Sequence, residues 1–192
     1  DEHTSRGLGD VYKRQIISAL KFSGKTKSGF SIGILDAITR EEKAIYIDSF
    51  GNEKTQPIEP FSNSFVLRLK KDMVDGKVVL GSFITHKTNN LSTAYLDSSF
   101  LKDALVLGGD FEYALPDPSW ILSGFAASSS IRGDSKVITQ IQKSSSHYFQ
   151  RPEDDIDVDS SLTSLIGVGS EISLTKISGK NFKGSLTFRQ TS

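Results

Sequence analysis

The chain has 192 residues, and its 23 basic and 23 acidic side chains give a formal net charge of zero. That balance argues against a nucleic-acid partner, because phosphate binding needs a basic excess on one face. The absence of cysteine excludes disulfide bonds and thiolate metal sites. Hydrophobic residues make up 36% of the chain, which suits a sheet with a polar face better than a soluble domain with a large core.

Residues 1–15 are set apart from the fold, because Ser5–Gln15 matches the translation of an adapter used to prepare sequencing libraries. Back-translating Asp10–Gln15 as GAT GTG TAT AAG AGA CAG reproduces the end of that adapter. We expect an assembly artefact there, as in metagenomic data, and a natural basic tail is the alternative. The chain also stops inside an alternating segment. We therefore expect residues 16–192 to be a partial β-barrel domain, truncated at both ends.

Alternation of apolar and polar residues predicts most of the remaining chain to be strand. We expect strands at residues 30–35, 43–50, 65–70, 77–85, 104–115, 120–131, 166–175 and 182–189. Reversals that join them as hairpins are expected at residues 41–42, 74–76, 116–119 and 178–181. Polar and turn residues predict exposed loops at residues 52–63 and 87–99.

The alternation is clearest between residues 104 and 115. One face of this segment is apolar, and the other is small or acidic and carries Asp110 and Glu112. No apolar run approaches the roughly 18 residues of a membrane-spanning helix, but a membrane strand needs only about 9 to 11 alternating residues. We therefore predict an all-β fold, an antiparallel up-and-down β-barrel fragment that forms an open curved sheet of about eight or nine strands.

One short loop helix is expected at residues 135–149. Val137, Ile138 and Ile141 lie there at helical spacing, with Asp134 as the N-cap and Pro152 as the stop. An irregular polar loop is the alternative.

Three patterns resemble chemical motifs without meeting their requirements. Gly29–Gly33 matches the nucleophile elbow of esterases, but Ser31 lies inside a predicted strand and no helix follows it. Gly24–Gly29 has the glycine spacing of a phosphate loop, but Phe30 stands where that loop needs a lysine. His86 and His147 are isolated, so zinc has no ligand set. We predict no catalytic residue and no cofactor.

Asp155, Asp157 and Asp159 are a weak calcium candidate, because they alternate like the start of a calcium loop. Ser160 occupies the place of the turn glycine, however, and Ile166 that of the bidentate glutamate. A solvated acidic loop is the favoured interpretation.

Several segments together resemble an uncharacterised family, a domain of unknown function that follows an N-terminal domain similar to family 9 carbohydrate-binding modules. The resemblance covers nearly all of residues 16–192. It is carried by Ile58–Pro60, Arg68–Leu69 with Asp72, Gly108, Gly109, Asp110 and Phe111, Thr163–Gly167 and, most specifically, Tyr148, Phe149, Gln150, Arg151 and Pro152. It implies an outer-membrane β-barrel whose partner domain binds glycan, with no catalytic residues to carry over.

Our first hypothesis is a non-catalytic segment of a barrel in the bacterial outer membrane, serving glycan binding, uptake or surface display. Its partners would be outer-membrane lipid and, through a missing N-terminal domain, glycan. A soluble β-sandwich binding module is the alternative, with the apolar faces against a second sheet. A carbohydrate hydrolase, the third reading, needs two carboxylates about 5 to 10 Å apart. Its candidates are Glu59, Asp110, Glu112 and Glu171.

Overall fold

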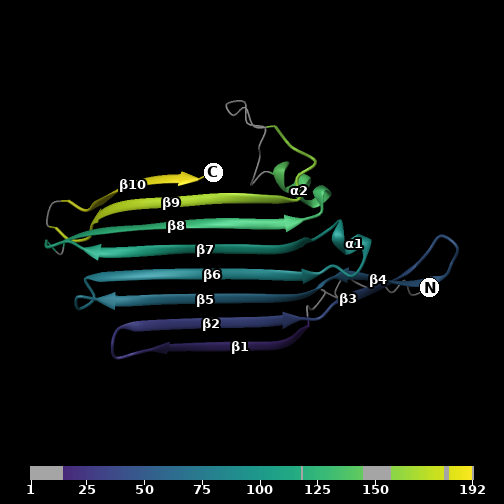
Figure 1. Cartoon of the computed structure of the whole chain (residues 1–192), viewed down its shortest axis with the longest axis horizontal. Coiled ribbons are helices and arrows are strands. Elements are labelled where there is room, and N and C mark those ends of the chain that lie inside the picture. The colour runs from purple at the N-terminus through teal and green to yellow at the C-terminus, as the bar shows by residue number, and fades with distance from the viewer. Residues whose placement is uncertain (1–14, 118, 145–156, 180–181, 192) are drawn as a thin grey trace, which may run out of the picture.

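The computed structural model describes residues 15–117, 119–144, 157–179 and 182–191, which fold as one open antiparallel sheet with additions at one end (Figure 1). Eight strands form this sheet in the order β1-β2-β5-β6-β7-β8-β9-β10, so β1 and β10 are its edges. The prediction of an all-β, antiparallel, up-and-down open sheet is confirmed. The elements are β1 (Ile16–Lys25), β2 (Phe30–Thr39), β3 (Glu42–Ile47), β4 (Glu53–Glu59), β5 (Phe61–Met73), β6 (Val78–Asn90), α1 (Ala94–Asp97), β7 (Leu101–Ala114), β8 (Trp120–Gly133), α2 (Ser135–Gln142), β9 (Ser164–Lys176) and β10 (Gly184–Thr191).

The two ends of the sheet differ in their connections (Figure 1). At one end, the turn end, short connections join β1 to β2, β5 to β6, β7 to β8 and β9 to β10. Backbone hydrogen bonds close these turns, such as those from Thr26 N to Phe30 O (2.7 Å) and from Lys77 N to Val74 O (3.1 Å). At the other end, the loop end, the chain builds the separate β3–β4 hairpin and the helices α1 and α2.

Several strands are longer than the sequence pattern predicted. β5 and β6 span 13 residues each, so β5 takes up the end of the expected loop at 52–63 and β6 the start of the loop at 87–99. β4 and α1 fill much of the rest, which makes both loop predictions wrong over most of their length. The strand ends carry polar residues on both faces, as in Thr88–Asn90. Alternation therefore stops before the hydrogen-bonded ladder does, since Phe61 still pairs with Asn90.

The predicted loop helix exists, but it is shorter than expected. α2 begins after Asp134, whose carboxylate accepts a 2.8 Å hydrogen bond from Lys136 N, as an N-cap does. It ends at Gln142. A second short helix, α1, begins after a Thr93 N-cap. Among the described residues, no helix is long and apolar enough to cross a membrane.

The small hydrophobic core lies at the loop end and not within the sheet. Leu96 of α1 and Val137 and Ile138 of α2 are the hydrophobic side chains buried in the described part of the chain. α2 contacts β8 and β9. The eight strands therefore form an extended wall, and both faces of that wall are open over most of its area.

Candidate functional site

One face of the sheet, the apolar face, is built from aligned aliphatic and aromatic side chains. The strand register places one row of them across five neighbouring strands: Phe22, Ile34, Leu67, Ile84 and Leu107. A second row runs through Phe111, Ile172 and Phe188. Many of these side chains are exposed, including Leu107 at 48% and Phe188 at 66%. The structure therefore presents a continuous apolar surface that nothing in the described chain covers.

The opposite face, the polar face, carries most of the charged side chains of the strand interiors, whereas Asp36 and Lys71 lie on the apolar face. Its register aligns one row across all eight strands, from Lys25 through Ser31, Lys70, Gly81, Asp110, Phe125 and Glu171 to Arg189. Asp110 lies on this face, as the alternation predicted, and its partner Arg68 lies two strands away on the same face. Along β6 and β9 the polar-face residues are less exposed than the apolar-face residues beside them. This is the reverse of the pattern in a water-soluble protein.

The strongest interaction on the polar face is an ion pair that crosses a whole strand. Arg68 of β5 reaches over β6 to Asp110 of β7, donating one hydrogen bond from Nη2 to Oδ1 at 2.8 Å and a shorter one from Nη1 to Oδ2. Gly81 lies beneath the pair, and a Cβ there would sit 2.6 Å from both partners. The bare backbone at Gly81 is thus what allows the pair to form.

Two further ion pairs lie on the polar face nearer the sheet edges. Together with the Arg68–Asp110 pair they form what we call the charged belt. Lys25 Nζ donates a hydrogen bond to Asp72 Oδ2 at 2.6 Å. Arg189 Nε donates to Glu171 Oε2 at 2.7 Å. The belt therefore holds its charges largely as pairs, which suits a wetted surface.

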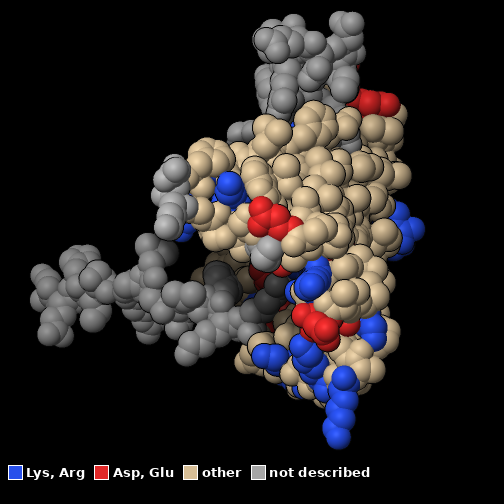
Figure 2. Space-filling model, turned by 90° about the vertical axis from the view of Figure 1, so that its left-hand side faces the viewer, with Lys and Arg blue, Asp and Glu red and all other residues tan. Residues whose placement is uncertain are grey.

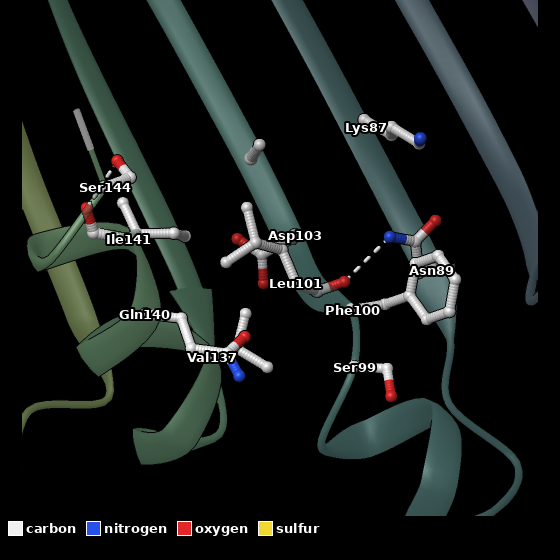
Figure 3. A pocket seen from close by; sticks show the side chains of 11 residues that line it. Lys87, Asn89, Ser99, Phe100, Leu101, Asp103, Val137, Gln140, Ile141 and Ser144 are labelled. Atoms are coloured by element: carbon white, nitrogen blue, oxygen red, sulfur yellow. Dashed lines mark hydrogen bonds between the residues drawn. The ribbon is translucent and has the colours of Figure 1, made fainter. Parts of the chain in front are cut away.

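A pocket of about 410 Å³ opens at the loop end, between α2 and the ends of β6 and β7 (Figure 3). Asn89 and Phe100 line one side, and Val137, Gln140 and Ile141 of α2 line the other. Asn89 donates a 2.7 Å hydrogen bond from Nδ2 to Leu101 O, while its buried Oδ1 accepts none from the described residues. The pocket is thus lined by both polar and apolar side chains from α2 and from the ends of β6 and β7.

Comparison with known families gives one match, to the domain of unknown function DUF5916, over residues 6–183. The chain belongs to this family. The match begins within residues 1–15, whose origin in an adapter stays a prediction. No curated protein and no solved structure matches the chain significantly.

In this DUF5916 member, two segments carry the family resemblance most specifically, Gly108–Phe111 and Tyr148–Pro152. Only the first lies among the described residues. Gly108–Phe111 lies in β7, where Asp110 forms the Arg68 pair and Phe111 belongs to the apolar face. Gly108 has no room for a side chain, because a Cβ would lie 2.7 Å from Ala126 O and 2.8 Å from the Phe83 ring. The other segment, Tyr148–Pro152, lies outside the described residues, as does His147.

The calcium candidate is only partly visible, since Asp155 lies outside the described residues. The Asp159 carboxylate accepts hydrogen bonds from Ser161 N (2.8 Å) and Oγ (2.6 Å), which lower its pKa. The nearly buried Gln142 bonds both backbone groups of Asp159 at 2.9 Å. Among the described residues, no three His, Cys, Asp or Glu side chains gather as a metal site would require. The calcium site stays a prediction.

The four carboxylates of the hydrolase hypothesis lie in three strands. Glu59 lies in the β3–β4 sheet. Asp110 and Glu112 are two residues apart on the polar face of β7, or roughly 7 Å along the strand. Asp110 and Glu171 share a row two strands apart, or roughly 10 Å between backbones, with Phe125 between them. An arginine contacts each of these two, and Arg68 occupies both carboxylate oxygens of Asp110. The hydrolase hypothesis stays a prediction.

Proposed function

We propose that this chain forms part of the wall of an outer-membrane β-barrel, with the apolar face against lipid and the polar face toward water. The observation that carries the proposal is the exposure of the apolar face. Leu80, Ile84 and Ile172, which lie within long strands, are each 38 to 47% exposed. Water makes such a continuous surface costly, at about 25 cal/mol for each Å². Lipid contact removes that cost.

The dimensions of the strands support a membrane-crossing wall. β5 to β9 have 13 or 14 residues each, more than twice the usual strand length of about 5 to 6. On β7 the apolar face extends from Leu105 to Tyr113, or roughly 27 Å at about 3.4 Å per residue. The apolar band of outer-membrane barrels is about 25 Å tall.

The unequal ends of the sheet support the same proposal. Outer-membrane barrels join their strands by short turns on one side of the membrane and by longer loops on the other. Here the turns and the elaborate connections segregate in the same way (Figure 1). Aromatic girdles flank the apolar band of such barrels. Phe30, Tyr113 and Trp120 lie at the turn end of the apolar face.

Within the barrel, we assign the wall a non-catalytic role in glycan binding, uptake or surface display. The glycan part rests on the resemblance to proteins with a carbohydrate-binding N-terminal domain. The charged belt of the polar face is suited to a water-filled interior, because its ion pairs need hydration. The pocket at the loop end would lie at the mouth of that interior.

Adjacent single cysteines can test the orientation of the two faces, because the chain has no cysteine of its own. Ile84→Cys and Thr85→Cys are neighbours on β6 that point to opposite faces, so each controls for the other. After labelling with an environment-sensitive fluorophore and refolding into vesicles, the label at 84 should be quenched by lipid-borne quenchers. The label at 85 should be quenched by aqueous iodide.

Two outcomes would contradict the proposal. Quenching of both labels by iodide would show that the apolar face does not meet lipid. A chain that stays in the soluble fraction, with the label at 84 shielded from both quenchers, would favour the β-sandwich alternative.

A further inference from the structure

Several lysines gather at the turn end of the sheet. Figure 2 views the molecule from this end and shows basic side chains gathered over its lower half, where β1, β2, β5 and β6 turn. Between the row from Lys25 to Arg189 and the turns, basic residues of the described chain outnumber acidic ones by eight to six: Lys25, Lys27, Lys70, Lys71, Lys77, Lys176, Lys183 and Arg189 face Asp72, Asp75, Asp110, Glu112, Asp117 and Glu171. The surplus makes this end attractive to anions.

A hollow of about 580 Å³ lies within this basic region, between the β1–β2 and β5–β6 turns. Its charged lining consists of Lys25, Lys27, Lys71, Asp72 and Asp75. Lys25 is occupied by its 2.6 Å ion pair with Asp72. The hollow therefore presents Lys27 and Lys71 as its cationic groups toward an incoming ligand.

Lys71 links the hollow to the apolar face. Its strand position pairs with Phe30 on that face, and its ammonium lies 4.2 Å from the centre of the Phe30 ring. It also donates a short hydrogen bond to Ser28 O in the β1–β2 turn. Phe30 is 52% exposed. An amphiphile could thus place a charged group beside Lys71 and its hydrocarbon chain along the surface that begins at Phe30.

Lys176 repeats this arrangement farther along the sheet. Its ammonium lies 5.2 Å from the centre of the Trp120 ring, again at the turn end of the apolar face. At the loop end, by contrast, Arg132 is neutralised by Asp103 at 2.9 Å. Asp36, on the apolar face, accepts a 2.8 Å hydrogen bond from Asn63. The pairing of a lysine with an aromatic ring thus marks the turn end.

We propose that the hollow between the β1–β2 and β5–β6 turns binds the headgroup of an anionic phospholipid, with Lys27 and Lys71 contacting its phosphate. This inference rests on the proposed membrane wall. It goes beyond that proposal by assigning the turn end to a leaflet of anionic phospholipid. The acyl chains of the bound lipid then lie against Phe30 and the row of apolar side chains beyond it.

The test compares refolding of the whole chain into vesicles of phosphatidylcholine alone and of phosphatidylcholine with phosphatidylglycerol. Trp120 is the single tryptophan of the chain and lies at this end, so its emission reports insertion. We expect wild type to prefer the anionic vesicles. Lys27→Gln with Lys71→Gln should reduce that preference by more than about 25-fold, because general attraction to the anionic surface alone accounts for about fivefold for each lysine.

Lys77→Gln with Lys183→Gln is the matched control, because it removes the same charge from the same end outside the hollow. We expect this control pair to lose clearly less of the preference for anionic vesicles. Equal losses in the two double variants would mean that general electrostatic attraction explains the preference, and they would overturn the proposal. Insertion without any lipid preference would also overturn it and leave the membrane wall standing. Failure to insert into either vesicle would overturn both.

Discussion

Replacing Leu107 by arginine tests the lipid-facing assignment at the middle of a strand. Leu107 lies near the midpoint of β7 and is 48% exposed, so about half of its side chain would contact lipid. An arginine on the lipid face at the bilayer midplane costs about 2 to 4 kcal/mol. We therefore expect Leu107→Arg to lower the free energy of unfolding in lipid by about 2 to 4 kcal/mol.

Val106→Arg is the control for this substitution. Val106 is the preceding residue of the same strand and points to the polar face, between Thr85 and Ser129. An arginine there should cost less than about 1 kcal/mol, since it meets water and polar neighbours. Urea titration of the chain in vesicles, followed by Trp120 emission, measures both variants. A near-neutral Leu107→Arg, or equal costs for both, would refute the assignment of the faces.

Three further predictions concern the polar face and the loop end. Gly81→Ala should displace the Arg68–Asp110 pair, because the new Cβ lies 2.6 Å from both partners, and a lowered urea midpoint should show it. Asp110→Asn removes the carboxylate of the same pair and should also lower the urea midpoint, and adding Gly81→Ala to it should cause less than the sum of the two losses. Gln142→Ala should cost about 1 to 3 kcal/mol and speed hydrogen exchange at the Asp159 amide, whose partner is Gln142 Oε1; unchanged exchange would contradict that contact.

The sequence was most informative where one face of a strand is consistently apolar. The segment predicted at 104–115 corresponds to β7, Leu101–Ala114, and both faces are as expected. Asp134 likewise located the start of α2, because a capping carboxylate is a local signal. β1 was not predicted as a separate strand, and β4 fell inside an expected loop. Neither has the regular alternation that reveals a half-buried strand.

The polar-face site depended on information that local patterns do not contain. Asp110 was recognised as a polar-face residue, but its partner Arg68 lies 42 positions away along the chain and two strands away in the sheet. The register that aligns them is set by hydrogen-bonded ladders between strands. The role of Gly81 follows only from that register, because in the sequence it is one glycine inside a predicted strand. Local sequence patterns likewise gave no sign of the hollow between the β1–β2 and β5–β6 turns.

The lysines at the turn end help to distinguish lipid from a second protein sheet as the cover for the apolar face. A sheet packed over that face would enclose Lys71 and Lys176 beside Phe30 and Trp120, and burying an ammonium that has no carboxylate in contact costs several kcal/mol. Lipid imposes no such cost. A lysine at the edge of the hydrocarbon can keep its stem against the aromatic ring and extend its charge to the headgroups. The two lysine–aromatic pairs would therefore destabilise a sandwich, whereas they are favourable at a membrane surface.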